Sequence, residues 1–121
     1  HSIAIMHKPL HWHPICALDD IVPDTGVCAL VNDRAVAVFH LRPLAADEAP
    51  RVCAIDNVDP NSNASVLSRG IVGNLGERTV VASPIYKHHF DLDSGECLEA
   101  PEHSVQSYPV RLHDDFIWVG A

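Results

Sequence analysis

The sequence predicts an all-β domain, an antiparallel sandwich or barrel of short strands with little helix. Apolar and β-branched residues recur with period two in short runs, and turn residues separate these runs at intervals of about 8–12 residues. Nine prolines, which break helices and mark strand ends, are spread along the 121 residues. Many short strands bounded by turns are typical of sandwiches and barrels.

The first strands in chain order form a tight hairpin in this prediction. Residues 27–31 and 35–39 are rich in Val, Leu and Ala, and Asn32 and Asp33 join them. Such a polar pair accepts the positive φ of a two-residue hairpin turn. Residues 23–26, Pro-Asp-Thr-Gly, supply the turn that precedes the hairpin.

The remaining strands are expected to be short as well. Single strands are expected at 52–55 and 79–82, one hairpin at 90–98 with its turn at 93–95, and another from 105–112 to 116–119 with its turn at 113–115. The Ala- and Glu-rich residues 43–49 predict one or two helical turns or an inserted loop. Residues 70–76 hold three glycines without the spacing of a nucleotide-binding loop, which predicts a loop with glycine turns.

Length and charge limit the function classes. We expect residues 9–121 to form a single domain, and residues 1–8 to be a tag remnant or a disordered N-terminus. A formal net charge of −8, with only 8 Lys and Arg, argues against nucleic acid and anionic membranes as partners. No stretch approaches the ~20 apolar residues that span a bilayer, and no secretion signal is evident, so we expect a cytoplasmic protein.

The four cysteines predict neither disulfides nor a metal site. Cys16, Cys28, Cys53 and Cys97 include no Cys-x-x-Cys pair. Three of them fall in or beside expected strands, where small thiols are usually core residues. Reduced thiols are the expectation for a cytoplasmic protein, and a cluster rebuilt from these four is disfavoured.

Two short segments carry most of the functional information. Residues 56–61 read Asp-Asn-Val-Asp-Pro-Asn, and residues 83–92 begin Ser-Pro-Ile-Tyr-Lys-His-His. With their prolines and flanking residues they resemble the two loops of a Rieske iron–sulfur domain, which carry Cys-x-His and Cys-x-x-His. The four ligand positions of that pattern fall on Asp59, Asn61, Ser83 and Tyr86. Because none is Cys or His, the resemblance predicts the Rieske-like fold without its [2Fe–2S] ligands.

Residues 65–70, Ser-Val-Leu-Ser-Arg-Gly, narrow the resemblance to the small subunits of assimilatory NAD(P)H-dependent nitrite reductases. That family implies a large-subunit partner that carries FAD, sirohaem and a [4Fe–4S] cluster and reduces nitrite to ammonium. On this chain the resemblance implies no catalytic, cofactor-binding or metal residue. The vacated loops are then either retained packing or a docking tip.

For the docking alternative we predict a contact surface from residues in and near the two loops, since Tyr and Arg are favoured at interfaces. Its members are Leu67, Arg69, Tyr86, Lys87 and His88.

Two other interpretations remain open from the sequence. A Rieske-type ferredoxin serving an oxygenase would require cluster ligands that the loops lack. A metal-binding or regulatory β module could use some of the nine histidines. His11 and His13 would share one face of a strand, but surface histidines near a chain end are the simpler interpretation. His88 and His89 would face opposite sides, which disfavours a joint site.

Overall fold

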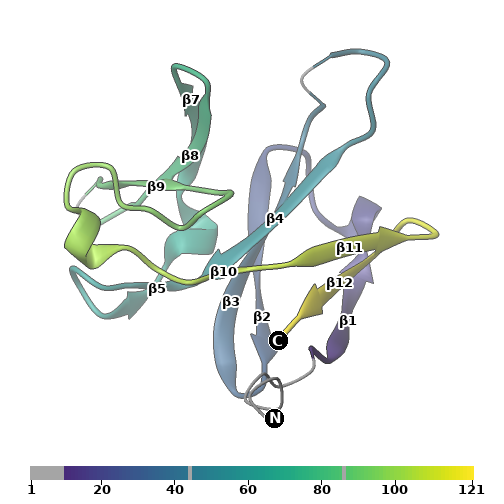
Figure 1. Ribbon diagram of the computed structural model, residues 1–121, viewed down its shortest axis with the longest axis horizontal. Helices are drawn as coiled ribbons and strands as arrows, with labels where there is room; N and C mark the ends of the chain where they lie inside the picture. The colour runs from purple at the N-terminus through teal and green to yellow at the C-terminus, as the bar shows by residue number, and fades with distance from the viewer. Residues whose placement is uncertain (1–9, 44, 86) are drawn as a thin grey trace, which may run out of the picture.

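The computed structural model describes residues 10–43, 45–85 and 87–121. Within these ranges the chain consists of short strands and short 3-10 turns (Figure 1). The strands are β1 (Trp12–Ala17), β2 (Thr25–Val31), β3 (Arg34–Leu41), β4 (Arg51–Asp56), β5 (Val58–Asp59), β6 (Ala64–Ser65), β7 (Ile71–Leu75), β8 (Arg78–Ala82), β9 (His89–Asp91), β10 (Ser107–Tyr108), β11 (Val110–His113) and β12 (Phe116–Gly120). The 3-10 turns are η2 (Leu18–Asp20), η3 (Leu67–Arg69) and η4 (Pro101–His103). No helix of the described residues is long and apolar enough to cross a membrane.

The strands form two halves of unequal size (Figure 1). The larger half contains a three-stranded sheet, β1-β12-β11, and a four-stranded sheet, β10-β4-β3-β2. The smaller half contains the pair β5-β6 and the sheet β7-β8-β9, and it lies between β4 and β10 in the sequence. Neighbouring strands are antiparallel throughout the described sheets.

Strand β3 is buried on both faces, and this joins the two halves. Val36 and Val38 belong to a core shared with Ile117 and Val119 of β12. The alternate residues of β3 belong to a second core with residues of the smaller half; together its members include Ala37, Phe39, Leu41, Leu67, Val81, Phe90, Leu92 and Cys97. A strand covered on both faces explains why residues 35–41 are almost continuously apolar. Its one polar residue in this stretch, His40, places Nδ1 2.7 Å from the Ile21 carbonyl oxygen.

The hairpin expected at 27–39 is confirmed, and of the one expected at 105–119 the part from 110 to 119 is confirmed, whereas residues 107–108 pair with β4 instead. Asn32 and Asp33 adopt φ values of 51° and 64° between β2 and β3. Asp114 and Asp115, at 52° and 59°, play the same role between β11 and β12. Only glycine and short polar side chains such as Asn and Asp adopt positive φ at low energetic cost, which is why the sequence predicts these turns.

One local expectation was wrong: residues 71–75 form strand β7, paired with β8, rather than a glycine loop. For residues 43–49 the loop alternative agrees with the structure, since residues 45–49 form a turn in which the Glu48 N–H donates to the Ala45 carbonyl. Residue 44 lies outside the described residues, as do residues 1–8 of the expected tag remnant. The hairpin expected at 90–98 is present, with the bridge Phe90–Cys97 and hydrogen bonds from the Asp91 N–H to the Glu96 carbonyl and from the Leu98 N–H to the His89 carbonyl.

Two further expectations for side chains need correction. Cys28 is exposed on the sheet edge strand β2 rather than in the core, whereas Cys53 and Cys97 are buried as expected. His13 lies within strand β1, half-buried and opposite Val119, and not at a frayed end. All four cysteines are free thiols.

Candidate functional site

The two loops that carry the vacated ligand positions meet in the smaller half. The first loop, residues 57–66, follows β4, and the second loop, residues 83–88, joins β8 to β9. Asp59 and Ser83 are both fully buried, and the Ser83 hydroxyl donates to Asp59 Oδ2 over 2.5 Å. The positions that would hold the two thiolates of a Rieske cluster are therefore in direct contact through oxygen atoms.

The Asp59 carboxylate is satisfied by protein donors alone. Its Oδ1 accepts from the backbone N–H of Asn61 at 2.9 Å and from the Asn61 side-chain amide at 3.2 Å. The Asp59 carbonyl accepts from the N–H groups of Ser62 and Asn63, so the chain reverses tightly around this residue. Such a turn is the usual environment of an Asx side chain. The buried Asp59 side chain thus accepts three hydrogen bonds, in line with the general requirement that buried polar groups be hydrogen-bonded.

Asn61, at the first vacated histidine position, ties the first loop to a third segment. Its side-chain oxygen lies 2.6 Å from Nδ1 of His103 in η4. Neither residue is fully buried. The two loops and η4 thus form one hydrogen-bonded tip.

The base of the first loop is held by two adjacent polar residues. Asp56 accepts from the Tyr108 hydroxyl at 2.5 Å and from the Arg34 guanidinium at 3.2 Å. Burial, followed by the hydrogen bond to Asp56 and its charge, raises the pKa of Tyr108 to about 12. Asn57 is buried and binds the segment leading into η3, donating to the Ser65 hydroxyl and accepting from the Ser68 N–H, each at 2.7 Å.

The family profile of the Rieske-like [2Fe–2S] domain matches residues 11–120. The chain belongs to this family. The Rieske-like fold expected from the two loops is thereby confirmed.

Relatives of this Rieske-like chain narrow its position within the family. The NADH nitrite reductase small subunit of Escherichia coli (strain K12) is 44% identical over 106 residues, which cover 88% of this chain and 94% of the relative. A crystal structure from Mycobacterium tuberculosis, provisionally assigned as an NADH-dependent nitrite reductase small subunit, is 43% identical with a TM-score of 0.83, covering 94% of this chain and 97% of that one. The resemblance to nitrite reductase small subunits is confirmed.

A third relative places the same domain in a different context. The NAD(P)H nitrite reductase large subunit of Klebsiella oxytoca is 36% identical over 109 residues, which cover 90% of this Rieske-like chain but 11% of the relative. In that protein a domain of this kind is one small part of the large-subunit polypeptide.

The donors at the loop positions do not fit a [2Fe–2S] cluster. A Rieske cluster needs two thiolates and two imidazoles, whereas the described positions supply the carboxylate, amide and hydroxyl of Asp59, Asn61 and Ser83, which bind one another. Tyr86, the fourth position, lies outside the described residues. The thiolate of Cys53 is disfavoured as a ligand, since burial and then the charge of Asp93 raise its pKa to about 12. In the described part of the chain no three His, Cys, Asp or Glu side chains converge as a metal site.

One residue of the contact surface predicted from the sequence does not belong to it. Leu67 is fully buried in the core beneath the smaller half, because η3 turns its side chain inward, so it cannot belong to an exposed surface. Arg69 and Lys87 are exposed, and His88 is half-buried with its Nδ1 shielded from solvent and without a hydrogen-bond partner among the described residues. Tyr86 again lies outside the described residues.

Sequence reasoning missed two apolar residues on these loops. Val58 of the first loop is 39% exposed and Ile85 of the second is 46% exposed. Val58 lies between the buried Asn57 and Asp59, so period two would have marked it as outward-facing. Ile85 follows Pro84 in a turn, where no such periodicity applies. Exposed apolar side chains of this kind can be buried at a protein–protein contact.

Proposed function

We propose that this chain is the small subunit of a cytoplasmic NAD(P)H nitrite reductase that reduces nitrite to ammonium in nitrate assimilation. In this proposal the chain carries no cluster and acts by docking on the large subunit. FAD, sirohaem and a [4Fe–4S] cluster belong to the large subunit. The relatives from Escherichia coli and Klebsiella oxytoca support this role by their names and by the presence of a similar domain within a large subunit.

The observation that carries the cluster-free, docking part is the hydrogen bond between Asp59 and Ser83. A Rieske cluster would join the two loops through metal, and here side-chain oxygens join them directly. Loops already held together lose little conformational entropy when a partner binds. The pair therefore supports a rigid docking tip rather than an electron carrier.

The docking surface that we propose consists of Val58, Arg69, Ile85, Lys87 and His88. It combines two of the few cations of an acidic chain with two exposed apolar residues. Basic groups would steer the encounter toward an acidic face of the large subunit, and the apolar residues would be buried on contact.

Co-expression with a sirohaem-type nitrite reductase large subunit tests the proposal. We expect NADH- or NADPH-dependent nitrite loss to require both chains, and the purified small chain to contain no iron. Visible bands of a bridged iron cluster with two irons per chain would contradict the cluster-free role. Full activity of the large subunit alone would contradict the subunit role.

Paired substitutions test the docking surface. We expect Arg69→Ala combined with Lys87→Ala to weaken co-purification with the large subunit, while circular dichroism shows an intact fold. Arg111→Ala is the matched control, because Arg111 is an exposed cation on β11 in the other half of the molecule (Figure 1). Equal co-purification of the two variants would remove this surface from consideration.

A further inference from the structure

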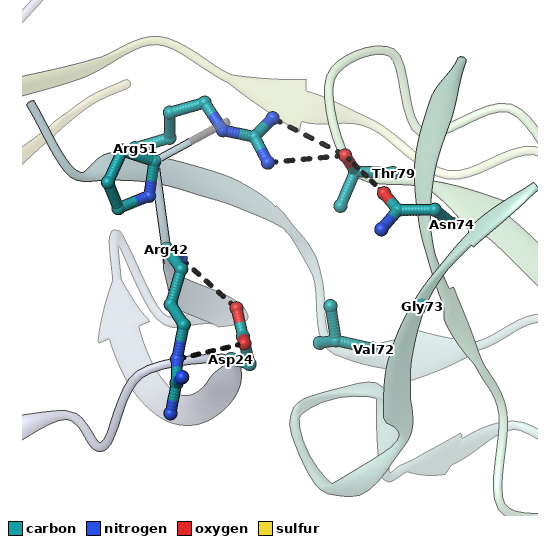
Figure 2. A pocket seen from close by; sticks show the side chains of 8 residues that line it. Asp24, Arg42, Arg51, Val72, Gly73, Asn74 and Thr79 are labelled. Atoms are coloured by element: carbon teal, nitrogen blue, oxygen red, sulfur yellow. Dashed lines mark hydrogen bonds and ion pairs between the residues drawn. The ribbon is translucent and has the colours of Figure 1, made fainter. Parts of the chain in front are cut away.

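A polar pocket of ≈ 250 Å³ lies away from the two loops, where the end of β3 and the start of β4 face the β7–β8 hairpin (Figure 2). Both halves of the molecule contribute to its wall. Its lining includes Asp24, Arg42, Arg51, Val72, Asn74 and Thr79. Nothing in the proposed function uses this pocket.

Arg51 is the unusual member of the wall. It is half-buried, and its Nη1 and Nη2 both point to one neutral acceptor, the Thr79 hydroxyl, at 3.3 and 3.4 Å (Figure 2). Its Nε is shielded from solvent and has no hydrogen-bond partner in residues 10–43, 45–85 and 87–121. Although the sequence holds 16 Asp and Glu against 8 Lys and Arg, Arg51 makes no ion pair with any described carboxylate.

The guanidinium is held in place without being neutralised. The Thr79 hydroxyl, which accepts from Arg51, donates in turn to Oδ1 of Asn74 at 3.2 Å. This fixes the Asn74 amide, whose nitrogen faces the space between Arg51 and Asp24 in Figure 2. The Asn74 amide nitrogen and the Arg51 N–H groups that Thr79 does not accept are thus held in place before any ligand arrives, which lowers the entropy lost on binding.

The net charge of the wall favours a single negative charge. Asp24 is the one carboxylate in the described wall, and it is paired with the Nε of Arg42 at 3.3 Å and with the Arg42 N–H at 3.1 Å. Arg51 therefore supplies the one uncompensated charge. Because Nη1 and Nη2 both face Thr79 and Nε is shielded from solvent, a ligand can use only the remaining N–H groups on the Nη atoms, which suit a charge-assisted hydrogen bond to a carboxylate oxygen.

We propose that this pocket binds a carboxylate group, held by the Arg51 guanidinium and the Asn74 amide. The volume is somewhat below the range of about 300–1,000 Å³ that holds drug-sized molecules, so it fits a small organic acid or one acidic side chain. Bare nitrite would leave most of the space empty. A phosphate dianion would bring a second negative charge toward Asp24.

The isolated chain tests the proposal by NMR, through the Nε–H signal of Arg51 and the amide signals of Asn74 and Thr79. Butyrate, which carries one negative charge, represents a free organic acid, and N-acetylglutamic acid α-amide represents an acidic side chain. We expect a saturable shift of these signals with at least one of the two, in the millimolar range, and none with acetamide at matched ionic strength. Binding of only one probe identifies the source of the carboxylate.

Three variants test whether Arg51 and Asn74 hold the carboxylate. Arg51→Gln removes the cation, and we expect it to weaken binding by roughly tenfold or more. Asn74→Asp keeps Arg51 but supplies an internal carboxylate that competes for it; Asn74 is exposed, so this variant should fold even if Arg51→Gln does not. Arg111→Gln, which alters an exposed arginine stacked on Trp12 in the other half, should bind as the unaltered chain does.

The inference would be overturned by the absence of a saturable shift with both acids. Unchanged binding in Asn74→Asp would also overturn it, and so would tighter binding of inorganic phosphate than of either carboxylate. Because the isolated chain is used, these outcomes are independent of whether the chain docks on a nitrite reductase large subunit.

Discussion

At the level of single residues, the loops show how two ligand positions become a structural pair. Asp59 places a carboxyl group where a thiolate would stand, and the Ser83 hydroxyl donates a hydrogen bond to it. The chemistry of the side chains could be recognised in the sequence, since none of the four positions is Cys or His. Their mutual contact could not, because it joins residues 24 positions apart, in β5 and directly after β8, and these strands belong to different sheets.

We expect Ser83→Ala to lower the free energy of unfolding by about 1–3 kcal/mol, because it leaves the buried Asp59 carboxylate short of a donor. Urea unfolding measures the change. Ser107→Ala is the control, because Ser107 is half-buried in β10, far in the sequence from the two loops. When Asp59 is already replaced by Asn, Ser83→Ala should lower the free energy of unfolding by a smaller amount. Equal losses for the two serines would show that the pair does not stabilise the loops.

Tyr108 provides a second prediction at this scale. Burial, then the hydrogen bond and charge of Asp56, raises its pKa to about 12, against about 10 in an unfolded chain. The folded state thus holds the Tyr108 proton to higher pH than the unfolded chain does. The contribution of protonated Tyr108 to the free energy of unfolding is therefore complete below about pH 10 and is lost as the pH rises toward the pKa of the folded state. Absorbance titration should show one of the chain's two tyrosines ionising late.

Asp56→Asn should move the late tyrosine transition to lower pH, because it removes the negative charge beside the phenol. Two tyrosines that titrate together at the ordinary value, before and after this substitution, would contradict the assignment.

At the level of elements, the sequence was sufficient to predict the tight turns but not the pairing of strands that lie far apart in the chain. The hairpin from Thr25 to Leu41 follows from Asn32 and Asp33, which adopt positive φ with adjacent apolar runs on both sides. Strand β7 was not predicted from the sequence, because Gly73 interrupts the alternation of apolar and polar residues and because its end residues, Ile71 and Leu75, are exposed. The pairing with β8 decides its conformation, and no local signal reports that pairing.

Two glycines of this region give opposite predictions. A Cβ at Gly70 would lie 2.3 Å from the Ala82 carbonyl oxygen and 2.6 Å from Val81 Cγ2, whereas a Cβ at Gly73 would meet nothing within 4 Å. Gly70→Ala must therefore push the entry of β7 away from β8, at a cost of about 1–3 kcal/mol. Gly73→Ala should change the stability by less than about 0.5 kcal/mol. Thermal unfolding of the two variants, compared directly, checks the difference, and equal midpoints would refute it.

At the level of the whole molecule, the two cores are the two faces of one strand. Val36 and Val38 of β3 face the core of the larger half, and Phe39 and Leu41 face the core beneath the loops. The smaller half therefore cannot lose its packing without exposing one face of the strand at the centre of the other half. We infer that both halves unfold in a single transition, which keeps the loop tip as rigid as the sandwich that carries it.

The positions of the aromatic residues make this testable. Both tryptophans, Trp12 and Trp118, lie in the sheet β1-β12-β11, so their fluorescence reports the larger half, while far-UV circular dichroism reports all strands. Phe90→Leu perturbs only the core of the smaller half, where Phe90 is fully buried, and should cost about 1–3 kcal/mol. If β3 couples the halves, the tryptophan midpoint falls as far as the circular dichroism midpoint. Ile71→Val, on the exposed face of β7, should leave both midpoints unchanged. A tryptophan transition that stays in place while an earlier circular dichroism phase appears would mean that the loop half unfolds by itself, and a rigid docking tip would then have no structural basis.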